Sequence, residues 1–317
     1  MTLLSILIAL ALEQFRPLPL ERVVRAPVAR LATFLEQHLN DGIRLHGGIA
    51  WCLGAALPAA LLLLVHALLK ATQPLLALLV GLGVLYLTMG FRQFSHFFTD
   101  IHIALRAGEI DQARKILAAW RGQGGDQLSS SEVARLAIEQ ALPLANRHVF
   151  APLFWFVLLG PAGALLYRLA HLLNEFWNRP GSPEVPGLAE AGEFGWFAQR
   201  AFALLNWVPV RITAAAFAVV GDFEDAVNCW RTQAARWPDQ INGILLASGA
   251  GALGVRLGMP VHSLPHELNA ADERPELGLG DEADADFMQS TIGLVWRSLV
   301  LCLTVLALIQ ISAWVGG

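Results

Sequence analysis

The stretch LHGGIAWCLGAALPAALLLLVHALL, residues Leu45–Leu69, contains no aspartate, glutamate, lysine or arginine and is long enough to cross a bilayer as one helix. Three further runs share both properties, namely Ala71–Phe91, His148–Tyr167 and Ser298–Gly317. A buried helix of a soluble protein could imitate one such run, but four in one chain argue against a soluble protein. The composition agrees, with 55% apolar residues, 15% charged residues and a mean hydropathy of +0.51.

These runs predict an all-α, polytopic helical membrane protein with about five or six spans and a cytoplasmic helical subdomain. Spans are expected near 49–69, 75–91, 149–169 and 294–315, and the first fifteen residues are interpreted as a retained hydrophobic helix. Pro74 favours a tight turn because it cannot extend the preceding helix, so the first two spans should form a hairpin.

The chain divides into three predicted regions. Residues 1–91 hold the N-terminal membrane helices and a basic loop, 92–148 form the cytoplasmic helical subdomain, and 149–317 form a C-terminal membrane region. Ser129 and Glu132 in the subdomain have the spacing of a capping box, which predicts a helix beginning there.

The distribution of lysine and arginine predicts the orientation. Segments 16–44 and 92–148 contain five and seven such residues, whereas the turn between the hairpin helices contains only Lys70. The positive-inside rule then places both basic segments of this multi-pass protein in the cytoplasm.

The C-terminal region is less regular. Segment 194–221 is apolar but contains several polar residues and Pro209, which favours a broken or re-entrant helix. Segment 240–258 is rich in small residues, and Gly249, Gly251 and Gly254 would let another helix approach closely. Two further segments have the composition of loops, 178–193 with proline and glycine and 262–286 with acidic residues.

Composition also limits the partners. The net charge of −4 argues against nucleic acid as a partner, and the apolar runs make membrane lipid the expected one. No metal site is expected: His262 and His266 have i, i+4 spacing, but Pro265 between them disfavours a regular helix. The three cysteines lack CxxC spacing and are interpreted as packing residues.

Six stretches in this order resemble the CobD/CbiB family. They are LRAGEIDQARKILAAW (105–120), SEVARLAIEQ (131–140), APLFW (151–155), NWVPVRITA (206–214), GAGALGVRLG (249–258) and ERPELG (273–278). The resemblance implies a membrane-bound adenosylcobinamide-phosphate synthase, an amide-forming ligase that joins an aminopropanol-type side chain to cobyric acid with ATP and magnesium. It also implies a multi-pass protein of the bacterial inner membrane and a small anionic or corrinoid-type ligand. The APLFW and WVPVR stretches also occur in AmpE, a related non-enzymatic membrane protein linked to β-lactamase induction, so an AmpE-like sensor or regulator is the alternative.

Several acidic positions of the synthase pattern are changed in this chain. A Glu-Asn-x-x-Asp-Gly pattern is replaced at Pro143, Leu144, Arg147 and His148, and an Asp-Asp pair is replaced by Phe202 and Ala203. An Asn-Thr-Leu-Asp-Ser pattern becomes 171–175, with Asn174 and Glu175 at its end, and a Ser-Pro-Asn segment becomes 237–239. Magnesium prefers carboxylate ligands, so we expect weak or absent catalysis, with ATP and magnesium as cofactors only if the synthase activity is retained.

The remaining polar residues predict a ligand pocket. The candidates are Arg135, Glu139, Arg200, Asn206 and Arg211. An arginine within an apolar stretch is costly and faces protein, water or a counter-charge, which a hydrated pocket would supply. Two simpler explanations stay open: Arg135 could pair with Glu139 one turn away, and Arg211 with Asp222.

Overall fold

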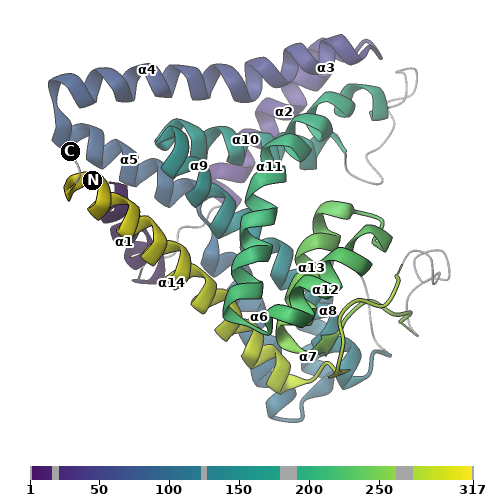
Figure 1. Cartoon of the computed structure of the whole chain (residues 1–317). Helices are drawn as coiled ribbons and strands as arrows, with labels where there is room; N and C mark the ends of the chain where they lie inside the picture. The colour runs from purple at the N-terminus through teal and green to yellow at the C-terminus, as the bar shows by residue number, and fades with distance from the viewer. Residues whose placement is uncertain (1, 16–20, 123–126, 179–190, 262–273, 316–317) are drawn as a thin grey trace. The chain divides into compact units, whose positions relative to one another are not determined.

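The computed structural model describes residues 2–15, 21–122, 127–178, 191–261 and 274–315, and they are helical almost throughout, which confirms the all-α class (Figure 1). The helices are α1 (Thr2–Phe15), α2 (Ala26–Leu39), α3 (Arg44–Trp51), α4 (Leu57–Thr72), α5 (Pro74–Thr88), α6 (Phe91–Arg106), α7 (Ile110–Arg121), α8 (Ser130–Ala145), α9 (Ala151–Leu159), α10 (Pro161–Trp177), α11 (Ala191–Val220), α12 (Phe223–Gln233), α13 (Gln240–Leu253) and α14 (Ala285–Val315). Two π-helical turns, Cys52–Ala56 and Asn146–Phe150, join α3 to α4 and α8 to α9.

Four helical stretches are long and apolar enough to cross a membrane: Arg44–Thr72, Ser130–Leu159, Glu193–Val220 and Ala285–Val315. Three shorter apolar helices accompany them, Leu3–Phe15, Pro74–Thr88 and Gln240–Leu253. The first and last of the long stretches bury few of their side chains and expose large apolar ones, including Leu64 at 68% and Leu308 at 61%. Such large exposed apolar side chains fit contact with lipid, so the chain has the helices of a membrane protein.

The predicted N-terminal hairpin is confirmed. Figure 1 shows α3 and α4 as one continuous rod that turns back into α5. Only Gln73 separates the two helices, and Pro74 occupies the first turn of α5, where its missing N–H costs no helical hydrogen bond. The hairpin therefore follows directly from the position of the proline.

The expected span at 149–169 is wrong as a single helix. Gly160 has a left-handed backbone (φ 66°), and Pro161 begins α10, so the chain reverses at this point. The two helices then pack closely, because a Cβ on Gly163 would lie 2.3 Å from the carbonyl oxygen of Trp155. The apolar residues before Gly160 instead continue α8, which makes Ser130–Leu159 the candidate span.

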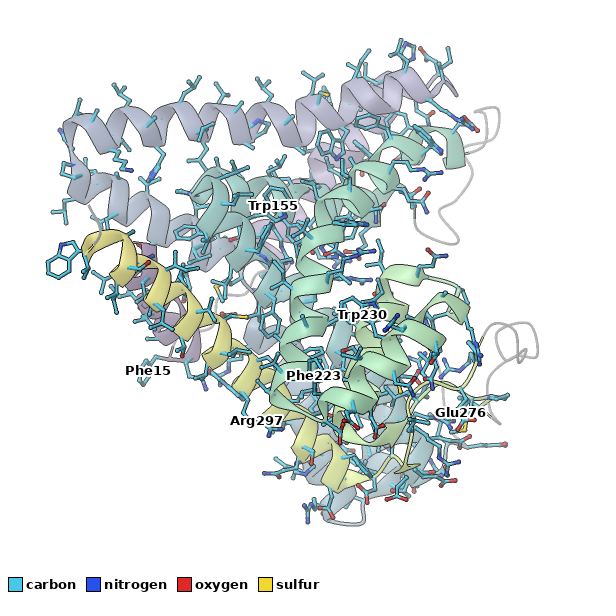
Figure 2. The ribbon with its side chains drawn as sticks, viewed as in Figure 1. Phe15, Trp155, Phe223, Trp230, Glu276 and Arg297 are labelled. Atoms are coloured by element: carbon cyan, nitrogen blue, oxygen red, sulfur yellow. The ribbon has the colours of Figure 1, made fainter. Side chains whose placement is uncertain are left out.

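The expected break in segment 194–221 is also wrong, because α11 runs as one helix through Pro209. Proline removes the N–H that would bind the carbonyl four residues earlier, which is that of Leu205. The indole of Trp155, labelled in Figure 2, donates its Nε1–H to this carbonyl oxygen at 3.0 Å. A side chain from α9 thus supplies the missing donor, and the helix needs no break.

The chain forms two compact units, each built from two separate segments. Unit 1 comprises residues 1–90 and 151–208, and unit 2 comprises 91–150 and 209–317. The three-part division by membrane sidedness, which the sequence suggests, stays a prediction. The core of unit 1 contains the aromatic pair Trp177 and Phe194, and the Trp177 indole donates to the carbonyl oxygen of Ala32 at 3.2 Å.

Unit 2 packs its helices closely at small residues. A Cβ on Gly251 would lie 2.5 Å from the carbonyl oxygen of Asp225 on α12, and one on Gly249 would lie 2.7 Å from Leu142 on α8. The close approach predicted at these two glycines is confirmed, whereas Gly254 has φ 68° and ends α13. Beyond it, the short strands β1 (Val255–Arg256) and β2 (Asp281–Glu282) pair in parallel.

Two smaller predictions have clear outcomes. The capping box is confirmed, since the Ser129 hydroxyl accepts from the Glu132 N–H and the Glu132 carboxylate accepts from the Ser129 N–H. The expected loop at 178–193 ends in helix, because α11 begins at Ala191. Its remaining residues from 179 to 190, and both His262 and His266, lie outside the described residues.

Candidate functional site

A polar cavity of about 180 Å³ lies within unit 2 and is the main candidate site. Its lining residues come from α7, α8, the π-helical turn, α13 and the segments beside α13: Arg121, Leu136, Glu139, Gln140, Pro143, Leu144, Arg147, Trp237, Asn242, Leu246 and Arg274. The ionisable groups among them are three arginines and one glutamate, so the lining carries a net charge of +2, from 3 − 1.

Helix α8 forms one wall of the cavity. Leu136, Glu139, Gln140, Pro143 and Leu144 recur at intervals of three and four residues, which places them on one face of a helix. Arg147 continues this face in the π-helical turn that follows. The regular spacing of α8 therefore delivers one acid and one base to the same side.

Glu139 is held by two partners from the segment after α13. Its Oε1 accepts the backbone N–H of Gly258 at 2.8 Å, and its Oε2 accepts from Arg274 Nη2 at 2.7 Å. Both side chains of this ion pair are nearly buried, at 8% and 10% exposed. Arg274 also donates to the carbonyl oxygen of Met259 and lies over the Trp237 ring, so the pair joins α8 to two distant segments.

Arg147 has a neutral partner. Its Nη2 donates to the amide oxygen of Asn242 at 3.0 Å, and its Nε is buried without a hydrogen-bond partner among the described residues. Asn242 is placed by the first turn of α13, where Asp239 caps the backbone N–H groups of Ile241 and Asn242. No carboxylate of the described residues lies within ion-pair distance of Arg147.

Arg121, at the end of α7, completes the positive lining. Burial lowers the pKa of its guanidinium, and the charge of Arg274 lowers it further, while the Glu139 carboxylate opposes both effects. No hydrogen bond or ion pair joins its side chain to another residue in the described part of the chain. The site therefore holds a cation in an environment that disfavours its charge.

Three of the predicted pocket residues lie in unit 2. Glu139 lines the cavity, whereas Arg135, one turn earlier on α8, donates to the carbonyl oxygen of Pro260 at 3.3 Å. Glu139 pairs with Arg274, so the simple ion pair between Arg135 and Glu139 does not form among the described residues. Arg211 lies on the C-terminal part of α11, and the Asp222 side chain caps α12 by accepting the Asp225 N–H.

The other two predicted residues lie in unit 1. Asn206 is almost fully buried and accepts a hydrogen bond from the Tyr167 hydroxyl at 3.0 Å. The Arg200 guanidinium lies 5.6 Å from the centre of the Trp196 ring on the same helix. One pocket shared by all five residues therefore stays a prediction.

Two residues within the changed motifs of the synthase pattern make structural contacts. Phe202 is buried against the rings of Tyr167 and His171, with centroids 5.6 and 5.2 Å away. Glu175 accepts from both terminal nitrogens of Arg25, in an ion pair between α10 and the turn before α2. Phe202 and Glu175 thus each stabilise a contact between two segments of unit 1.

Three cavity residues were missed as site candidates from the sequence. Arg274 lies within the quoted ERPELG stretch and Arg147 at a changed position, so both were visible but had no assigned role. Arg121 ends α7, and its sequence position carries no signal of a site. Only the packing of α7, α8 and α13 shows that these arginines lie around one cavity.

A second cavity lies in unit 1. It measures about 400 Å³ and is lined mainly by apolar side chains of α4, α5, α9 and the start of α10, with His66 and Lys70 as its ionisable groups. Its apolar walls suit hydrocarbon and offer little chemistry. In the described residues, no group of three or more histidine, cysteine, aspartate or glutamate side chains is placed to hold a metal ion.

Comparison with known proteins identifies relatives along nearly the whole chain. The chain is 37% identical over 308 residues to "Cobalamin biosynthesis protein CobD" of Stutzerimonas stutzeri, covering 96% of each protein. It is 35% identical to the protein of the same name from Chromobacterium violaceum, covering 77% of this chain and 75% of the relative. No solved structure matches the chain significantly. The family model described as "CobD/Cbib protein" matches residues 6–295, and the chain therefore belongs to the CobD/CbiB family.

Proposed function

We propose that this chain is an inner-membrane protein of cobalamin assembly, and that it binds an intermediate of the amide-forming step without catalysing that step. The similarity to CobD proteins over almost the full length supports the pathway. The observation that carries the binding role is the lining of the unit 2 cavity, where three arginines surround a single glutamate that already has two hydrogen-bond partners.

The cavity residues fit an anion better than magnesium. Magnesium binds carboxylate oxygens and water in near-octahedral geometry. The one carboxylate of the lining accepts hydrogen bonds through both oxygens, and the three guanidinium groups beside it repel a cation. The lining of this cavity therefore does not fit magnesium, alone or bound to ATP.

The second candidate is an AmpE-like membrane sensor. The same cavity lining favours it: Arg147 stands where the resemblance expects an acid, and its contact with the neutral Asn242 leaves the charge of the pocket positive. A sensor needs a ligand site and a partner but no ligase chemistry. The two candidates differ in the pathway that supplies the ligand.

Complementation of a strain that lacks adenosylcobinamide-phosphate synthase tests the absence of catalysis. Expression of this chain should not restore growth in medium without cobinamide derivatives, whereas the authentic synthase should restore it. Immunodetection of a tagged chain in the membrane fraction controls for expression. Full growth at normal expression would show that the chain is a synthase.

Deletion in the native host separates the two binding roles. If the chain acts in cobalamin assembly, the deletion should lower the total corrinoid content and leave β-lactamase induction unchanged. A normal corrinoid content with altered induction would contradict the cobalamin role and favour the sensor.

A further inference from the structure

We propose that the cavity of unit 2 binds a phosphate-type dianion directly through Arg121, Arg147 and Arg274, with no divalent cation between ligand and protein. The inference names the ligand chemistry of the candidate site and so rests on the binding role proposed above. Beyond that role, the ligand carries two negative charges, three arginines recognise it, and its binding needs no metal ion.

Charge is the first argument. The ion pair with Glu139 already balances Arg274, which leaves the charges of Arg121 and Arg147 without a carboxylate in the cavity lining. Guanidinium groups remain charged in proteins, so the lining keeps its net charge of +2. A phosphate monoester carries close to two negative charges at neutral pH and would balance that charge, whereas a carboxylate would balance only half.

Unsatisfied donors are the second argument. Arg147 Nε is buried without a hydrogen-bond partner among the described residues, and its Nη2 contacts a neutral amide. Arg121 has no hydrogen bond within the described part of the chain, and burial and the neighbouring Arg274 lower the pKa of its guanidinium. Charged donors that are partly withdrawn from water are costly when unpaired, and an oxyanion between these two half-buried arginines would supply acceptors for both.

Size and shape are the third argument. The cavity has a volume of about 180 Å³, well above the roughly 10–15 Å³ that one water requires on the same measure, so it can hold one phosphate group. Arginine recognises phosphate through two parallel N–H groups, and several arginines can bind different oxygens of the same group. The apolar Leu136, Leu144 and Leu246 leave the remaining wall unsuited to a second charged group.

The test uses the purified full-length chain in a neutral detergent with EDTA present. Isothermal titration with inorganic phosphate should give a dissociation constant of about 1 mM or lower, measured against sodium chloride at the same ionic strength. Arg147→Ala should weaken this binding about tenfold or more, because it removes a charge-assisted contact. The matched control is Arg231→Ala, which removes an exposed arginine of α12 and should leave the constant within about twofold.

Two further arms keep the result interpretable. Thermal unfolding without phosphate shows whether each variant is folded, and Arg147→Lys, which keeps the charge, should lose less affinity than Arg147→Ala. Nanodiscs with or without phosphatidic acid separate the two sources of a phosphate group. Loss of inorganic phosphate binding in the phosphatidic acid discs would identify a lipid headgroup, and unchanged binding a soluble ligand.

Three results would overturn the inference: no phosphate-specific binding by the wild type, binding that requires added magnesium, or equal affinities for folded Arg147→Ala and wild type. These failures are distinct from failure of the proposed function. Restored growth in the complementation assay would refute the non-catalytic role without changing the phosphate measurement, and absent phosphate binding would leave the growth result unchanged.

Discussion

Replacing Trp155 with phenylalanine should destabilise the protein by about 1 kcal/mol, because it removes the only side-chain donor to the Leu205 carbonyl oxygen among the described residues. The N–H of residue 209 would normally bind that carbonyl, but Pro209 has none. Phenylalanine keeps an aromatic ring at position 155, so the change mainly removes the hydrogen bond.

Two ranges of measured hydrogen-bond energies set the expected loss of stability for Trp155→Phe. A buried acceptor left without a partner costs about 1–3 kcal/mol in water-soluble proteins. Hydrogen bonds between membrane helices contribute less, about 0.6 kcal/mol on average and at most about 1.7 kcal/mol. Circular dichroism during unfolding with a rising fraction of dodecyl sulfate in mixed micelles would measure the free-energy change. Trp51→Phe is the matched control: the Trp51 Nε1 is buried without a partner in the described part of the chain, so its removal should be neutral or slightly stabilising.

A double-mutant cycle isolates the interaction. Pro209→Ala restores a backbone N–H that can bind the Leu205 carbonyl within α11, so the Trp155→Phe change should cost much less in that background. The coupling energy of the cycle should be about 1 kcal/mol. An equal cost of Trp155→Phe in both backgrounds would refute the proposed role of the indole, as would an equal cost for Trp51→Phe.

Three other predictions test packing, titration and topology. Gly251→Ala should destabilise unit 2, because its Cβ would lie 2.5 Å from the Asp225 carbonyl oxygen, whereas Gly293→Ala, with open space around it, should be neutral or stabilising by up to about 1 kcal/mol in the same unfolding assay. Burial is the main cause of a lowered pKa at His102, so the neutral form stabilises the fold above the unfolded pKa of about 6.5 and this stability is lost as pH falls below it. His102→Gln should therefore reduce the loss of stability between about pH 7 and 5, and an unchanged pH profile would contradict this. A reporter fused after Gly122 should be active in the cytoplasm, and periplasmic activity would mean that the orientation is inverted.

Local composition is enough to predict the helical membrane class of this protein. A charge-free run such as Leu45–Leu69 must form a helix to satisfy its backbone in hydrocarbon, whatever its neighbours are. The hairpin at Pro74 and the capping box of Ser129 and Glu132 are equally local, since each depends on residues within a single turn. These predictions are confirmed because no distant contact is needed to form them.

The two wrong predictions concern the same physical question, whether a helix breaks. Pro209 alone favours a break in α11, but the Trp155 indole, fifty positions before Leu205 in the sequence, supplies the donor to the Leu205 carbonyl that keeps the helix whole. Gly160 permits helix in a charge-free run, yet its left-handed backbone and the close packing at Gly163 reverse the chain. A broken or continuous helix of this kind depends on partners that hydropathy does not show.

The candidate site depends on distant partners in the same way. Glu139 looked like half of a local pair with Arg135, whereas its partner is Arg274, which lies 135 positions along the chain. The sequence does not show that Arg121 and Arg147 lie near each other, because only the packing of α7, α8 and α13 brings both to one cavity. The hydrophobic effect depends on the residues of each segment alone, so the sequence is enough to predict which segments enter a membrane. A charged binding site depends on the distances between residues of several segments, and only folding brings those residues within a few ångströms of one another.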